Sequence, residues 1–353
     1  MKRRHFLHAV LATGLAPAVA RAQPRATKIL LRSSWQTVNI GDIAHTPGML
    51  ALLEKHRPDA VVTLWPNSLD RGVADLLRAR FPKLRIAATA AEQATALAAC
   101  DFFLHGSGPG LVGRKEAARA RQAGKPYGFG GVTLRDDEIR SDRDLLAEHD
   151  LEPGKFLCAI PRLRWTPYWE IHPGERKPIP ARIAENERFA EIDHAKLRAG
   201  ICAWVRETKM RVLLCPEMTY EVPLLRSLVF DRLPADVQPH VAVLDRYWLT
   251  AEACSVYAQA AAVVSLEQHS PIMAIAAGVP AVLVRQPTDT RKGRMWYDLG
   301  MRDWVFEIDD TTGEQIAARL VQIGRDLPAA RQAAARARDL AHEKMAAMLA
   351  AIP

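Results

Sequence analysis

Glu267 and His269 are the side chains of this sequence best placed for acid–base chemistry. They follow an apolar run, residues 262–265, that is typical of a buried strand, and a short helical pattern starts directly after them. Ser270 suits the start of that helix, because its hydroxyl accepts hydrogen bonds from free backbone N–H groups. Open α/β sheets bind ligands at the carboxyl ends of their strands, and helix N-termini favour anions. We therefore expect an anion site here, with a purely structural turn histidine as the alternative for His269.

A second loop with polar residues, Asn39-Ile-Gly-Asp42, comes after the first apolar run of the chain. Gly41 permits a tight turn or a close approach of the backbone to a ligand. Asn39 and Asp42 suit turn or cap positions, and either could instead hold a substrate hydroxyl. An ordinary turn, with the next helix opening at Thr46-Pro47, is the alternative interpretation.

A third loop is rich in glycine and follows the strand-like residues 102–105. Its first members are His105, Gly106, Ser107 and Gly108, and a helical pattern comes after it, which is the position of an anion-binding loop. The spacing of its glycines matches neither a P-loop nor the dinucleotide-binding fingerprint. A loop that only lets a helix pack closely on a sheet is therefore the alternative.

Four basic residues could hold an anionic ligand. Arg162 and Arg164 follow the first predicted strand of the second half of the chain, and Arg291 and Lys292 lie in a later basic loop. A guanidinium group matches carboxylates and phosphates well, although a basic loop can also be a solvated surface. No group of His, Asp and Glu residues has the sequence spacing of metal ligands, so we predict no metal site and no other cofactor.

The elements that must position these loops form a repeating pattern. Short apolar runs alternate with helical patterns, which favours parallel sheets covered on both faces. The pattern restarts after residue 150, so we predict two Rossmann-like α/β domains, 27–150 and 151–327, with a loop or lid at 165–190 and a C-terminal helix at 328–353. Their strand ends would face a common cleft. The predicted strands are 28–32, 60–65, 85–88, 102–105, 127–132, 156–160, 211–215, 241–244, 262–265 and 281–284.

The N-terminus is typical of an export signal. Paired arginines precede a mildly apolar run, and Ala20-Arg-Ala22 has small residues at cleavage spacing, so residues 1–22 are predicted to be a twin-arginine signal peptide. This predicts the export machinery as a partner and a periplasmic or other extracytoplasmic location. An uncleaved, tethered form and a cytoplasmic tail are the alternatives. No segment of the mature chain is long and apolar enough to span a membrane.

Charge and cysteine content exclude several function classes. Residues 1–22 contain four basic residues and no acidic ones, so their removal lowers the formal charge from +8 to +4. That modest charge argues against nucleic acid as a partner. The five cysteines include no Cys-x-x-Cys pair, which excludes a zinc knuckle or a thioredoxin motif.

Taken in order, these segments resemble the polysaccharide pyruvyl transferase family. Residues 39–42 match its N-terminal Asn-x-Gly-Asp, residues 101–110 its strand and glycine loop, and residues 269–280 its histidine, small-residue helix and Gly-x-Pro. Lys292 stands near a lysine that often follows in the family. The family commonly has an arginine where this chain has Glu267, and its glycine loop lacks the interruptions seen here.

The resemblance covers about residues 35–310 and implies a two-domain fold of the glycosyltransferase B (GT-B) type. It implies transfer of a pyruvyl unit from phosphoenolpyruvate to a diol of a cell-envelope saccharide. His269 would be the general acid/base, helped by Asp42 or Glu267. Arg162, Arg164 and Lys292 would bind the donor.

Two other functions stay open. One is an exported, two-lobed protein that binds a saccharide or an anionic small molecule without catalysis. The other is a transferase or hydrolase that uses a different donor, with Glu267 and His269 as its acid/base pair.

Overall fold

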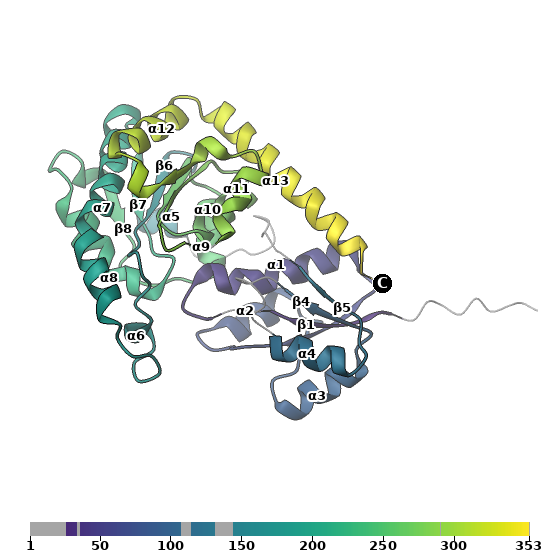
Figure 1. Cartoon of the computed structure of the whole chain (residues 1–353). Coiled ribbons are helices and arrows are strands. Elements are labelled where there is room, and N and C mark those ends of the chain that lie inside the picture. Colours follow the sequence, from purple (N-terminus) through teal and green to yellow (C-terminus); the bar gives the residue numbers. More distant parts are fainter. Residues whose placement is uncertain (1–25, 34–35, 107–113, 131–143, 290, 353) are drawn as a thin grey trace, which may run out of the picture.

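The structure is a computed structural model that describes residues 26–33, 36–106, 114–130, 144–289 and 291–352. It consists of two α/β domains and a long C-terminal helix (Figure 1). The predicted signal peptide, residues 1–22, lies outside the described residues. Among the residues described, no helix is both long and apolar enough to cross a bilayer.

The N-terminal domain is built on a parallel sheet of five strands in the order β3-β2-β1-β4-β5. Its central strands are almost fully buried, because helices cover both faces of a parallel sheet. The strands are β1 Lys28–Arg32, β2 Val61–Trp65, β3 Arg85–Ile86, β4 Phe102–His105 and β5 Tyr127–Phe129. The helices are α1 Ile40–His56, α2 Val73–Arg80, α3 Ala90–Ala99 and α4 Arg114–Gln122.

The C-terminal domain has a parallel sheet of six strands in the order β11-β10-β9-β6-β7-β8, which is the Rossmann order. The strands are β6 Phe156–Ile160, β7 Arg211–Leu214, β8 Val241–Val243, β9 Ala262–Ser265, β10 Ala281–Arg285 and β11 Val305–Glu307. The helices are α5 Leu145–Glu148, α6 Tyr168–Ile171, α7 Pro180–Thr208, α8 Val222–Leu224, α9 Thr250–Tyr257, α10 His269–Ala276, α11 Met295–Asp298 and α12 Gly313–Arg325. Short 3-10 or π segments are η1 Thr219–Glu221, η2 Leu225–Val229, η3 Phe230–Arg232, η4 Gln238–His240, η5 Arg291–Arg294, η6 Arg302–Trp304 and η7 Ile308–Asp310.

The C-terminal helix α13, Leu327–Ala350, runs from the second domain back to the first, as the yellow helix of Figure 1 shows. Ala334 and Ala337 are buried in a core cluster of the C-terminal domain, and Leu349 is buried in the main core of the N-terminal domain. Arg57 at the end of α1 donates a 2.9 Å hydrogen bond to the carbonyl of Ile352. Helix α13 therefore ties the two domains together along one side.

The structure corrects three predictions about elements. Helix α1 starts at Ile40 and not at Thr46-Pro47, because Asn39 caps it and Pro47 is accommodated inside the helix. The loop or lid predicted for 165–190 ends earlier: α6 interrupts it and α7 starts at Pro180, where a proline is tolerated because the first N–H groups of a helix have no partner. The edge strand β11 was not predicted; all three of its residues are only partly buried, and it lacks the continuous apolar pattern of the central strands.

Candidate functional site

The start of helix α1 is docked onto the C-terminal domain. The backbone N–H of Ile40 donates to the carbonyl of Glu217 at 3.2 Å, and the hydroxyl of Thr250 donates to the carbonyl of Ile40 at 2.7 Å. Asn39 and Met218 form an isolated antiparallel bridge across the domain boundary. These bonds fix the loop after β1 against the loop after β7, so the ends of strands from both sheets meet at one place.

The segment Asn39-Ile-Gly-Asp42 builds this contact. The side-chain oxygen of Asn39 accepts from the N–H groups of Gly41 at 2.8 Å and Asp42 at 3.1 Å, which makes it the N-cap of α1. Gly41 lies directly against His269: a Cβ atom at position 41 would come within 2.0 Å of the Cβ and Cγ atoms of that histidine. The glycine is therefore needed for a close approach between the two domains, and the motif is a helix start and not an isolated turn.

Glu217 is the centre of the site. Its carboxylate is fully buried and accepts from His269 Nδ1 at 2.8 Å, from the N–H and hydroxyl of Ser270 at 2.7 and 2.8 Å, and from the Asn39 amide at 3.3 Å. Burial alone would raise the pKa of Glu217, but its bonds to His269 and Ser270 outweigh burial and lower that pKa. The carboxylate is consequently ionised over the physiological range.

This arrangement corrects the expected anion site at the start of α10. We expected the N–H groups there to be open to a ligand, yet the N–H and hydroxyl of Ser270 are both bound to Glu217. Ser270 also accepts from the hydroxyl of Tyr257 at 3.0 Å. The helix N-terminus is thus neutralised by a carboxylate of the protein itself, and Ser270 is a buried structural residue.

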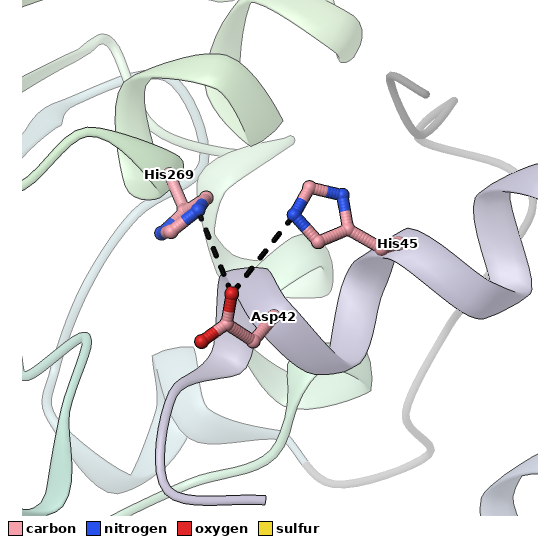
Figure 2. A group of neighbouring side chains, drawn as sticks. All are labelled: Asp42, His45 and His269. Atoms are coloured by element: carbon pink, nitrogen blue, oxygen red, sulfur yellow. Dashed lines mark ion pairs between the residues drawn. The ribbon is translucent and has the colours of Figure 1, made fainter. Parts of the chain in front are cut away.

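His269 is held in one orientation by its contact with Glu217. A carboxylate only accepts hydrogen bonds, so Nδ1 carries a proton, and in the neutral form of the ring Nε2 keeps its lone pair. Figure 2 shows that the imidazole faces Asp42 across the domain boundary, with 4.0 Å between His269 Nε2 and Asp42 Oδ1. A neutral imidazole held in this way is suited to accept a proton or to bind a metal ion.

An interdomain cleft of about 680 Å³ opens beside this histidine. Its walls come from the carboxyl ends of strands in both sheets, including the loops after β1, β6, β9 and β10, as the architecture predicted. Asp42, Arg162, Glu267 and His269 all line it. The segment around α6 forms the outer wall, where the hydroxyl of Tyr168 accepts a 3.1 Å hydrogen bond from the amide of Gln36.

Arg162 lies between two carboxylates in the cleft wall. Its Nε atom is 3.2 Å from Glu267 Oε1, and its guanidinium also forms an ion pair with Asp289. Burial raises the pKa of Glu267 to about 7, against the opposing effect of Arg162. Glu267 can therefore hold a proton near neutral pH. The positive charge of Arg162 is largely balanced by carboxylates of the protein itself.

Arg164 lies outside the cleft. Its guanidinium donates to Asp193 at 2.9 and 3.1 Å, pairs with Asp309, and stacks 3.4 Å above the ring of Phe189. It lines no part of the cleft, in contrast to the donor-binding role expected for it. Residues 162 and 164 follow the end of β6 and are not part of a strand, and the contacts of Arg164 with Asp193 and Phe189 are contacts with helix α7.

His105 and Gly106 are not brought to the cleft wall. His105 is buried at the end of β4 beside Arg32, and burial together with that positive charge lowers the pKa of His105. The N–H of Gly106 donates to the carbonyl of Arg32 at 2.8 Å. Neither His105 nor Gly106 lines the cleft. Ser107 and Gly108, and the side chains of Arg291 and Lys292, lie outside the described parts of the chain.

Sequence reasoning missed Glu217 and His45. Glu217 follows strand β7 by three residues, so the rule that ligands bind at strand ends applied to it as much as to His269. His45 is three residues after Asp42 and shares its face of α1, which became visible only once residues 40–45 were known to be helical. Asp42, His45 and His269 come from two domains, so their positions along the sequence show no spacing typical of metal ligands.

A scan of protein-family models finds none that matches the chain, and a search of curated proteins finds no match either. Solved structures do match. The glycosyltransferase of kitacinnamycin is 12% identical with a TM-score of 0.51, covering 93% of this chain and 98% of its own. A UDP-N-acetylglucosamine 2-epimerase is 10% identical with a TM-score of 0.52, covering 93% and 98%. UDP-GlcNAc 2-epimerase from Methanocaldococcus jannaschii is 12% identical with a TM-score of 0.50, covering 84% and 92%.

These similarities establish the fold. The chain has a GT-B-like fold, with two Rossmann-like domains that face a cleft, as predicted. At such low identity, the similarity shows the fold and not the chemistry of the site.

Proposed function

We propose that this protein is an exported transferase of the pyruvyl transferase type, which transfers a pyruvyl unit from phosphoenolpyruvate to a saccharide diol in the cell envelope. The observation that supports it most is the pair of His269 and Glu217, in which Nδ1 of the histidine contacts the carboxylate and the histidine lines the interdomain cleft. The sequence provides two further arguments. The order of the segments that resemble the family is the reason to propose phosphoenolpyruvate as the donor. The export signal predicted for residues 1–22 is the reason to propose a location in the cell envelope.

The pair would act as a general acid/base. His269 Nε2 accepts the proton of a saccharide hydroxyl as its oxygen bonds to the central carbon of the donor, and the methylene carbon takes up a proton to become a methyl group. The second hydroxyl then bonds to the same carbon. The carbon–oxygen bond to phosphate breaks, and inorganic phosphate leaves with the second proton. The buried carboxylate of Glu217 stabilises the imidazolium that forms in between.

The donor would be held by cations on the outer wall of the cleft. Arg176, Lys177 and Arg182 line it, and Arg182 stacks 4.1 Å above the ring of Trp165. Arg162 contributes from the inner wall while it remains paired with its two carboxylates. Because guanidinium and ammonium groups bind carboxylate and phosphate well, these residues suit a donor that carries both.

The test is mass spectrometry of envelope oligosaccharides incubated with the mature protein and phosphoenolpyruvate, together with a phosphate-release assay. We expect a ketal product from the native protein, and a loss of at least ~100-fold in His269→Ala, because general acid–base catalysis contributes about that much or more. The matched control is Tyr257→Phe, which removes the hydrogen bond to Ser270 but leaves the His269–Glu217 pair in place. No ketal product, with His269→Ala unchanged in every assay, would exclude the proposal.

One observation favours a second candidate, a transferase or hydrolase that uses a different donor. Glu267 is a buried carboxyl group in the cleft wall with a pKa of about 7, so it could serve as the acid partner of His269. In its ionised form it also adds negative charge where an anionic donor would lie. Turnover of a saccharide without phosphoenolpyruvate, abolished in Glu267→Gln, would support this candidate over the first.

A further inference from the structure

Three side chains from two domains form a group with the composition of a metal site. Asp42 and His45 project from helix α1, and His269 projects from the start of α10 (Figure 2). One ligand atom of each lies within 4.8 Å of the others. His45 Nε2 and His269 Nε2 are each 4.0 Å from Asp42 Oδ1, and the two rings meet edge to face with their centroids 5.6 Å apart.

The separations fit an ion better than direct bonds between the side chains. At 4.0 Å the nitrogen and oxygen atoms are beyond hydrogen-bonding distance. An ion at equal distance from all three atoms would lie roughly 2.5 Å from each, whereas zinc binds nitrogen and oxygen at about 2.0–2.2 Å. Small side-chain rotations, moving each ligand inward by roughly 0.3–0.5 Å, would complete the coordination.

The surrounding contacts orient two of the three ligands. Glu217 accepts from His269 Nδ1 at 2.8 Å, which leaves Nε2 as the ligand atom. The amide of Gln36 donates to Asp42 Oδ2 at 2.9 Å, which leaves Oδ1 directed at the histidines. A carboxylate behind a metal-binding histidine, and a hydrogen bond on the second oxygen of a metal-binding carboxylate, are the usual outer contacts of metal sites.

A bound cation would also balance the negative charge of the site. Asp42 and Glu217 are 15% and 0% exposed, and together carry two negative charges. Within the described residues, neither forms an ion pair with a lysine or arginine; their only ion-pair partners there are His45 and His269. A divalent ion would balance both charges, whereas arginine does so for Glu267 and Asp289 elsewhere in the cleft wall.

We propose that Asp42, His45 and His269 bind a divalent transition-metal ion of the zinc type at the domain boundary. Two histidines and one carboxylate leave at least one coordination position open, and Asp42 and His269 line the cleft, so that position faces a substrate. The ion and a proton compete for His269 Nε2. In the metal-bound form the ion, and not the imidazole, contacts the substrate oxygen and polarises it. This inference does not rest on the identity of the transferred group.

The experiment is calorimetric titration of the chelator-treated mature protein with zinc chloride, without donor or saccharide. We expect one tight site per chain, at least 100-fold weaker in Asp42→Asn and in His45→Gln, and about 10- to 100-fold weaker in Glu217→Gln. His45 does not line the cleft, so its variant separates metal binding from contact with substrate. His240→Ala is the matched control, because that histidine is exposed and precedes strand β8, whereas the group lies at the carboxyl ends of the strands.

Cobalt provides a second readout. Bound by two histidines and a carboxylate, Co²⁺ should give visible absorption bands that are absent in His45→Gln, while circular dichroism confirms that the variant is folded. Zinc affinity unchanged in both Asp42→Asn and His45→Gln, or no binding by the native protein, would overturn the inference. Metal binding without ketal formation would exclude only the pyruvyl transfer, and ketal formation without metal binding would exclude only the metal site.

Discussion

Replacing Glu217 by glutamine tests whether this carboxylate sets the state of His269. In Glu217→Gln the side-chain oxygen can keep both donors of Ser270, at 2.7 and 2.8 Å in the native protein. The new NH₂ group would then face His269 Nδ1 and the amide of Asn39, which are both donors at present. The imidazole can form a new bond only by accepting at Nδ1 and moving its proton to Nε2.

The expected cost follows from this exchange of bonds. The bonds of the carboxylate to His269 and Ser270 are charge-assisted, worth about 1.5–3 kcal/mol each, and glutamine replaces them by neutral bonds of about 1 kcal/mol, while the 3.3 Å bond from Asn39 is lost. The lower cost of burying an amide than a carboxylate offsets part of this loss. We expect the free energy of unfolding to fall by about 2–3 kcal/mol in urea titrations. Tyr257→Phe should lose only about 1 kcal/mol, because it removes one neutral bond.

The decisive readout is the position of the proton on the ring. Nitrogen NMR of the histidine side chains should show His269 protonated at Nδ1 in the native protein and at Nε2 in Glu217→Gln. A proton on Nε2 blocks both proton uptake and metal binding at that atom, so activity should fall by roughly 10²–10⁴. An unchanged tautomer, or full activity with the proton on Nε2, would refute the reasoning.

Three further perturbations address other parts of the site. Gly41→Ala should lower the free energy of unfolding by about 2–3 kcal/mol in urea titrations, because the added Cβ would lie 2.0 Å from the Cβ and Cγ atoms of His269. A decrease below ~0.5 kcal/mol would contradict the close contact. Because the pKa of Glu267 is raised in the folded protein, the wild-type free energy of unfolding should fall by roughly 3 kcal/mol as pH rises from about 4.5 to about 7. Urea titrations of Glu267→Gln at the same pH values should lack this decrease. Arg164→Ala should lower the free energy of unfolding by about 3–5 kcal/mol in thermal unfolding, since it leaves the charge of buried Asp193 without a partner. The KM for the donor should not change. A raised KM would show that Arg164 takes part in donor binding.

The order of elements could be predicted from the sequence because parallel strands are continuous apolar runs. Strands β1, β4, β6 and β9 were predicted with the bounds they have, since all four are central and their residues are almost entirely buried. The edge strand β11 has only partly buried residues, and so it gave no such signal. Rossmann topology then followed from the alternation of strands and helices.

The site was only partly accessible to the same reasoning. His269, Glu267 and Asp42 were identified because each follows a strand, and all three line the cleft. The sequence could not predict that Glu217 binds the N-terminus of α10, because Glu217 follows a different strand and is 52 residues from His269 in the sequence. Local sequence predicts that the N–H groups of a helix start need a partner, but only the tertiary structure decides whether the partner is a ligand or the protein.

The placement of Asp42 and His269 on different domains makes the site dependent on the domain boundary. The backbone of Ile40, bonded to the C-terminal domain on both sides at 3.2 and 2.7 Å, helps to hold Asp42 beside His269. Any rotation of the domains that breaks these bonds would separate the two side chains, while the His269–Glu217 pair, which belongs to one domain, would persist. The acid/base pair is therefore a property of the C-terminal domain alone, whereas the proposed metal site exists only when the two domains are docked.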